Sequence, residues 1–239
     1  MVRRLVMNSS PPQNANPDST PLSVLCFSDV LCFWAYASQI RFDEAQATFG
    51  ERIDFKSRCI SIFGSVRRQF ARVAESGGLS YNEKAQAAVA VYDHVEVHPE
   101  LWLRNIPSSS TPCHLFLCAI EAADARAGNA PGASAEVARQ LRIRFFRDLV
   151  DVSARSAQFA LAEDLSIPRA GIEEALASGD AHALLAEHAI QASTFGVAMS
   201  PTLILDGGRQ RLSGNVGYRV IEANITELLH RPPGEQSWC

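Results

Sequence analysis

The order of apolar and polar positions predicts a strand, a helix and a second strand near the start of the chain. Residues 22–29 form a nearly continuous apolar run, as expected for a strand that is buried on both faces. From 33 to 49 the apolar positions take a helical spacing, and Gly50 follows as a natural helix end. Residues 52–63 alternate and predict a second strand. This order makes a βαβ unit with two parallel strands and a right-handed crossover.

The middle of the chain, 65–195, is alanine-rich and has a helical pattern. One stripe repeats every four residues, which predicts one buried helix face made by Val137, Leu141, Phe145 and Leu149. The arginines of the same segment fall largely on its other faces. We expect them to be solvated rather than to bind an anion: Arg139, Arg142, Arg144 and Arg147.

Strand patterning returns after Met199. The stretch "SPTLILDGGRQRLSG" predicts a strand, a turn at 206–208 and another strand, and a closing helix follows at about 217–229. The fold class is therefore α/β, with one sheet interrupted by a helical subdomain.

Composition narrows the class of protein. The 239 residues are 47% apolar and 20% charged, which suits one large domain or a domain with an insertion. A net charge of -4 gives no reason to expect nucleic acid or an acidic membrane surface as a partner. No run approaches the roughly 20 apolar residues of a membrane span, and 1–20 are expected to be a disordered leader without a signal peptide. We therefore expect a cytoplasmic protein.

The six cysteines show no C-x-x-C spacing. Without a secretory signal they are expected to stay reduced, and Cys26 and Cys59 fall in strands that should be core. Cys113 and Cys118 lie five residues apart on a predicted helix and point to different sides of it. No metal site is predicted.

Three stretches resemble the DsbA-like branch of the thioredoxin superfamily. "FSDVLCFWAY" is similar to its F-x-D-x-x-C-P-W-C-Y motif, and "FGVAMSPTLILDGGRQRLSG" to its cis-proline strand and following loop. The helices of 145–197 are similar to those that precede that proline. The resemblance covers about 22–229 and favours the cytoplasmic relatives: FrnE-like proteins, hydroxychromene carboxylate isomerases and kappa-class glutathione transferases. It implies a thioredoxin-like domain at 21–64 and 196–230, a helical insertion at 65–195 and a tail at 231–239.

The departures from that motif concern the reactive residue itself. Cys32 stands at the nucleophile position, but Phe33 replaces the proline and Ala35 replaces the second cysteine. The internal dithiol of the oxidoreductases is therefore missing, whereas the isomerases and transferases typically carry serine where Cys32 stands.

Three functions are compatible with a single thiol. In the first, which we favour, the protein is a monothiol oxidoreductase. Its Cys32 forms a mixed disulfide with the substrate, and glutathione or another thiol resolves it. In the second, Cys32 takes the serine's place in a glutathione-dependent isomerase or transferase. The third is a binding protein without turnover. Cys239, in the tail, is a weaker candidate for a resolving thiol.

The reactive form of Cys32 is the thiolate, and a free cysteine has a pKa of about 8.5. We expect the amide groups of the helix N-terminus to lower this pKa, with Trp34 as a flat wall for the substrate. The resemblance implies a cis bond at Pro201 and pairing of the Ser200 main chain with the substrate, its hydroxyl being a further donor. It also implies that Ser213, Gly214 and Asn215 hold a carboxylate of glutathione.

Two further residues have weaker claims to a role. Asp29 is a candidate proton acceptor near the thiol, or else a cap of the turn. His114 matches a position where relatives tend to have histidine, and a core or capping role is favoured over a catalytic base. We expect a small thiol or disulfide as substrate, glutathione as co-substrate and no tightly bound cofactor. The oligomeric state, a homodimer included, is left open.

Overall fold

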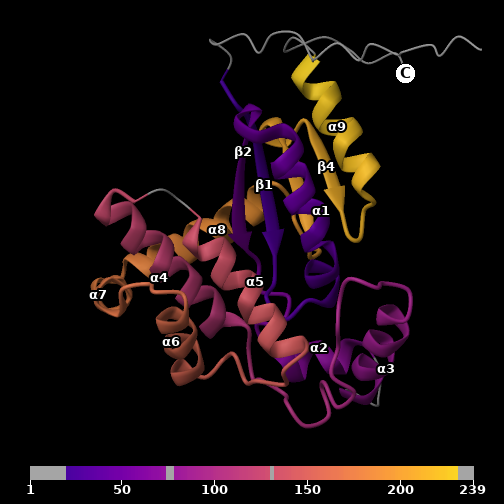
Figure 1. The fold of residues 1–239 in the computed structure, drawn as a ribbon, viewed down its shortest axis with the longest axis vertical. Coiled ribbons are helices and arrows are strands. Elements are labelled where there is room, and N and C mark those ends of the chain that lie inside the picture. Colours follow the sequence, from indigo (N-terminus) through magenta and orange to yellow (C-terminus); the bar gives the residue numbers. More distant parts are fainter. Residues whose placement is uncertain (1–19, 74–77, 130–131, 231–239) are drawn as a thin grey trace, which may run out of the picture.

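A four-stranded sheet forms the centre of the molecule in a computed structural model that describes residues 20–73, 78–129 and 132–230 (Figure 1). Its strand order is β2-β1-β3-β4. The strands are β1 (Leu22–Ser28), β2 (Ile53–Cys59), β3 (Thr202–Leu205) and β4 (Gln210–Ser213). β1 and β2 are parallel, while β3 is antiparallel to both β1 and β4. The predicted βαβ unit and the predicted hairpin are confirmed.

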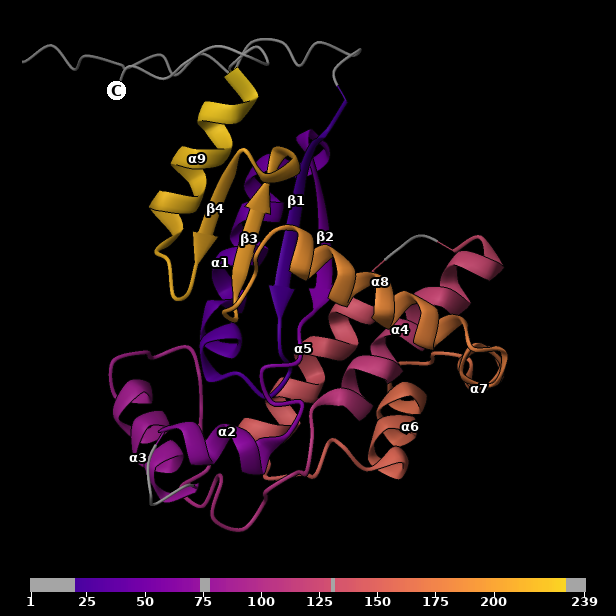
Figure 2. The same cartoon turned by 180° about the vertical axis from the view of Figure 1, so that it is seen from behind.

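Successive side chains of β1 point to opposite faces of the sheet, so both faces carry apolar residues, and helices cover both. Val24 and Cys26 pack against α1 (Phe33–Phe49) and α9 (Tyr218–His230). Phe27 points to the opposite face and packs against the end of α8 (Asp180–Thr194), which crosses in front of the sheet in Figure 2. α1 begins and ends where the pattern predicts it. Gly50, with a φ of 53°, ends it in a left-handed conformation that favours glycine.

The elements described between β2 and β3 are all helical, and apart from α8 they lie mainly at the end of the sheet where β1 ends (Figure 1). Besides α8, this part contains α2 (Val66–Val73), α3 (Gly78–Val89), α4 (Thr111–Ala127), α5 (Ala133–Phe146), α6 (Arg155–Asp164) and α7 (Arg169–Ser178). The core of this helical part includes buried aromatic rings from three of its segments: Trp102, Phe116, Phe145 and Phe146. The predicted fold class, a thioredoxin-like α/β fold with a large helical insertion, is confirmed. Among the described residues, no helix is both long and apolar enough to cross a membrane.

Two expectations for the helix around residue 141 are wrong. The apolar stripe predicts helix through Leu149, but α5 ends at Phe146 and Leu149 has a φ of 57°. Arg142 is not solvated: it is 5% exposed and donates to Gln39 Oε1 and Ser28 Oγ, both at 2.8 Å. Spacing along one helix cannot show that another element covers an arginine. The predicted leader (apart from residue 20) and the predicted tail with Cys239 lie outside the described residues.

Candidate functional site

Cys32 lies at the N-terminus of α1, directly after the turn that follows β1. Its backbone is extended (φ -86°, ψ 117°), and its carbonyl accepts the first helical hydrogen bonds from Ala35 and Tyr36, both at 3.1 Å. The thiol donates to the carbonyl oxygen of Ser200 at 3.2 Å. Residues far apart in sequence thus meet as the sequence predicts, with the sulfur facing the proline turn.

The protonation state of Cys32 differs from the prediction. Cys32 is only 7% exposed, and this burial raises the pKa of its thiol above the ordinary value; the charge of Asp29 adds to the rise. The backbone amides of Ala35 and Trp34 lower the pKa, as a helix N-terminus should, but burial outweighs them. The expectation of a pKa below the ordinary value is therefore corrected: in the free protein the thiol is protonated at neutral pH.

The Ser200–Pro201 peptide bond is cis, and its turn is tied to the Cys32 loop on one side. The hydroxyl oxygen of Ser200 accepts the backbone N–H of Asp29 at 2.9 Å, while the Ser200 carbonyl accepts the Cys32 thiol. On the other side, the carbonyl of Pro201 accepts the backbone N–H of Gly214 at 2.8 Å. Both polar oxygens of Ser200 therefore serve to hold the turn against the thiol.

Asp29 is completely buried and accepts hydrogen bonds from three separate parts of the chain. Oδ1 accepts the backbone N–H of Leu31 at 2.9 Å, and Oδ2 accepts the Phe63 N–H and the Ser110 hydroxyl, both at 2.8 Å. Burial alone would raise the pKa of this carboxyl, but His114 and the backbone donors hold it below the ordinary value. In this arrangement the carboxylate caps the turn before α1 and ties it to the loop after β2 and to the start of α4.

His114 is buried beside this carboxylate. Its Nε2 lies 3.3 Å from the backbone nitrogen of Val30 and 3.6 Å from Asp29 Oδ1. Its Nδ1 lies 3.3 Å from the hydroxyl oxygen of Ser61. These contacts give the ring a positioning role beneath the active-site turn, in agreement with the favoured prediction of a core or capping histidine.

The turn of residues 213–215 lies next to the proline turn. Gly214 has a φ of 83°, and a Cβ there would lie 3.4 Å from the Met199 side chain, so both conformation and space favour glycine. Asn215 is exposed, and its side chain bonds to Arg41 Nη1 and, at 2.6 Å, to the hydroxyl of Tyr92.

The sequence reading missed Arg41 and Tyr92 as site residues. Arg41 also donates to Ser38 Oγ at 3.4 Å and lies 5.7 Å from the centre of the Tyr92 ring. Within the described chain, no carboxylate lies within ion-pair distance of Arg41. A sequence signal existed, because Trp34, Ser38 and Arg41 fall at i, i+4 and i+7 on one face of the predicted helix.

Exposed apolar side chains border the thiol. Trp34 is 41% exposed and packs edge-on to Tyr92 with ring centres 6.4 Å apart. Met199, directly before Ser200, is 51% exposed. The site thus combines a buried thiol, apolar borders and, at the 213–215 turn, a cation without a carboxylate partner.

Comparison with known proteins agrees with the fold described above. The model of the DSBA-like thioredoxin domain family matches residues 23–226. No curated protein sequence matches the chain. The family model covers most of the chain, which therefore belongs to the DSBA-like thioredoxin domain family.

Solved structures with the same fold are distant in sequence. A probable DsbA oxidoreductase from Streptomyces coelicolor has a TM-score of 0.69 at 17% identity, covering 90% of this chain and 94% of its own. The cytosolic disulfide reductase DsbM from Pseudomonas aeruginosa has a TM-score of 0.64 at 17% identity, with 87% and 100% covered. A 2-hydroxychromene-2-carboxylate isomerase has a TM-score of 0.61 at 16% identity, with 86% and 95% covered. At these identities the similarity shows the fold alone.

Proposed function

We propose that the protein is a monothiol oxidoreductase in which Cys32 forms a mixed disulfide that glutathione resolves. The observation that carries this proposal is the Cys32 thiol at 3.2 Å from the carbonyl before the cis-proline, with Ala35 where a second thiol would stand. The five described cysteines are all free. A thiol that faces a substrate-pairing turn without a neighbouring cysteine requires an external thiol to complete a cycle.

The chemistry has two displacement steps. The Cys32 thiol first loses its proton to solvent, and the thiolate attacks one sulfur of a substrate disulfide, forming the mixed disulfide and releasing the other substrate sulfur as a thiolate. Glutathione thiolate then attacks the substrate sulfur of the mixed disulfide and regenerates Cys32 as the thiolate. In the net reaction, glutathione replaces one of the two thiols of the substrate disulfide. A second glutathione then reduces this glutathionyl disulfide, and oxidised glutathione leaves.

Arg41 and the 213–215 turn support glutathione as the resolving thiol. Glutathione carries two carboxylates, and a guanidinium without a carboxylate partner is the usual protein group for such an anion. The Gly214 amide is already bonded to the Pro201 carbonyl, so the turn contributes through Asn215, whose side chain bonds to Arg41 and positions it. The P. aeruginosa reductase has also been solved with GSH, at 16% identity to this chain. We place the activity in the cytoplasm, where glutathione keeps thiols reduced.

A glutathione-dependent isomerase or transferase is the second candidate. It is favoured by the raised pKa of Cys32, because a protonated thiol is a hydrogen-bond donor as a serine hydroxyl is. In that role Cys32 would donate to the glutathione sulfur without forming a covalent bond.

Incubation with oxidised glutathione should place one glutathionyl group on Cys32, detected by intact mass and located by peptide mass. Because the pKa of the thiol is raised, the rate should rise about tenfold per pH unit from pH 7 to 8.5 as the thiolate fraction grows. The Cys32→Ala variant should lose the adduct and Cys239→Ala should keep it. A rate that levels off below pH 7.5 would contradict the raised pKa of Cys32, and an adduct elsewhere would contradict the proposed nucleophile.

Replacing Arg41 by methionine should raise the KM for glutathione at least about tenfold, since a charge-assisted hydrogen bond contributes about 1.5–3 kcal/mol. The KM for the uncharged thiol 2-mercaptoethanol should change less than about twofold. Arg52→Met, in the short turn just after the C-terminal end of the same helix, is the matched control and should alter neither value. An equal loss with both thiols would mean that Arg41 only supports Asn215 and does not contact glutathione.

A further inference from the structure

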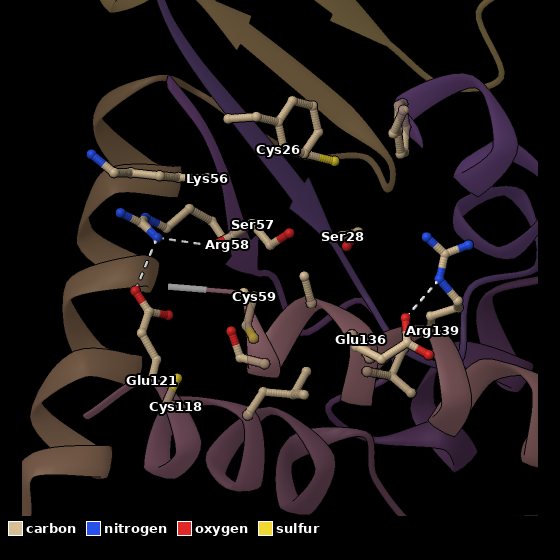
Figure 3. Close-up of a pocket in the computed structure, with 18 of the residues that line it drawn as sticks. Cys26, Ser28, Lys56, Ser57, Arg58, Cys59, Cys118, Glu121, Glu136 and Arg139 are labelled. Carbon is tan, nitrogen blue, oxygen red and sulfur yellow. Dashed lines mark hydrogen bonds and ion pairs between the residues drawn. The ribbon is translucent and has the colours of Figure 1, made fainter. Parts of the chain in front are cut away.

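A second group of cysteines lies where the end of β2 meets α4 and α8. A cavity of about 560 Å³ opens between β1, β2, α1, α4 and α5 (Figure 3). Its wall includes Cys59 at the end of β2, Cys118 in the middle of α4 and His188 in α8. One ligand atom from each of these three residues lies within 4.8 Å of the other two. Figure 3 shows Cys59 and Cys118 in the same part of the wall, next to the Arg58–Glu121 ion pair.

His188 is oriented toward this group by its own contacts. Its Nδ1 lies 3.8 Å from the Cys118 sulfur and accepts the backbone N–H of Cys59 at 3.3 Å. That hydrogen bond is longer than most N–H bonds in proteins. The other ring nitrogen, Nε2, is buried and has no hydrogen-bond partner in the described structure, although the residue is only 2% exposed. Because Nδ1 accepts the hydrogen bond from Cys59, the proton of the neutral ring is on Nε2, and Nδ1 is the nitrogen whose lone pair lies beside the two sulfur atoms.

We propose that Cys59, Cys118 and His188 form a binding site for Zn²⁺. Two sulfur atoms and one imidazole nitrogen are the donor set that this cation prefers, and a fourth, open position toward the cavity can be filled by water. In a tetrahedral zinc site the donor atoms lie about 3.5–3.8 Å apart, so the three side chains need shifts of an ångström or less.

Binding at this site is an exchange of protons for a cation. Contact with the Cys118 side chain and burial raise the pKa of the Cys59 thiol, while burial and the charge of Arg58 lower the pKa of His188 to about 4. As two S–Zn bonds and one N–Zn bond form, each thiol releases its S–H proton to solvent, and no electron is transferred.

The geometry of the chain explains why no metal spacing is visible in the sequence. The three ligands come from a strand end and two helices, which the fold brings together behind β2. Cys113, on the same helix as Cys118, points elsewhere, with its sulfur 3.3 Å from the Val152 carbonyl. The sequence-based expectation of no metal site rested on C-x-x-C spacing, which this arrangement does not use.

Cobalt titration of the full, reduced, chelator-treated chain tests the proposal. One equivalent of Co²⁺ should produce the near-ultraviolet sulfur-to-cobalt absorption and the visible bands of a tetrahedral ion, and one equivalent of Zn²⁺ should remove them. Cys59→Ala, Cys118→Ala and His188→Gln should each weaken Zn²⁺ binding by at least about 100-fold in competition with a chromophoric chelator, since even residues that only support ligands contribute 10–100-fold. Cys26→Ala, in the same cavity wall but outside the group, and Cys113→Ala should retain the cobalt spectrum.

Wild-type protein supplies a test that does not depend on folding of the variants. Zn²⁺ should slow alkylation of Cys59 and Cys118, measured by peptide mass, while Cys32 reacts at an unchanged rate. A cobalt spectrum without thiolate absorption, or one that is lost in Cys32→Ser, would overturn the proposal. Because the Cys32→Ser variant is expected to keep the metal site, its result also separates this site from the proposed oxidoreductase function.

Discussion

Replacing Cys32 by serine is expected to lower kcat/KM for disulfide exchange by at least about 10⁴-fold, as loss of a covalent nucleophile does in other enzymes. A serine hydroxyl cannot form the mixed disulfide, and no cysteine stands at position 35 to take over. The activity to measure is the glutathione-dependent reduction of a small disulfide. The oxidised glutathione that forms is detected in an assay coupled to glutathione reductase.

The same variant separates the two candidate functions. The serine hydroxyl can still donate to the Ser200 carbonyl, so stability should change by no more than about 1 kcal/mol in urea denaturation. A variant that is folded and inactive supports the monothiol mechanism. Retention of more than a tenth of the exchange activity would contradict that mechanism, whereas glutathione-dependent isomerisation that survives the substitution would favour the isomerase.

Replacing Asp29 by asparagine should reduce the free energy of unfolding by about 3–5 kcal/mol, the usual cost of breaking a buried charged network. The carboxylate accepts three hydrogen bonds at 2.8–2.9 Å, and an amide NH₂ would face at least one of these donors. Urea denaturation measures the effect. The matched control, Asp164→Asn, removes a surface ion pair with Arg144 and should cost at most about 1 kcal/mol. A change in Asp29→Asn as small as in the control would contradict the structural role of the network.

The pH dependence of stability tests whether folding lowers the pKa of the Asp29 carboxyl. The pKa of Asp29 is lower in the folded protein than in the unfolded chain, where it is about 3.9. Its contribution is therefore complete above the unfolded pKa and is lost as pH falls through the folded pKa. Wild-type protein should consequently lose more stability than Asp29→Asn as the pH falls below about 5. Equal slopes for the two proteins would show that the folded carboxyl does not have a lowered pKa.

The local pattern of apolar and polar residues was sufficient to predict the strand and the helix around Cys32. The apolar run of β1, the helical spacing of α1 and the glycine after it are short-range signals, and the structure has these elements at the predicted positions. The stripe around residue 141 was less reliable. It extended past the real end of α5, and its solvated-face interpretation failed for Arg142, which packs against β1 and α1. Contacts with other elements decide such cases, and they leave no trace in the spacing.

The sequence by itself determined that a cysteine stands at a helix start, that the second thiol is absent and that a Ser-Pro pair begins a later strand. These are properties of neighbouring residues. The tertiary structure alone decided that the Cys32 thiol is protonated, because burial depends on what the rest of the chain places around it. It also decided that Arg41 meets Asn215 and that Cys59, Cys118 and His188 converge, since each contact joins side chains from elements that only folding brings together.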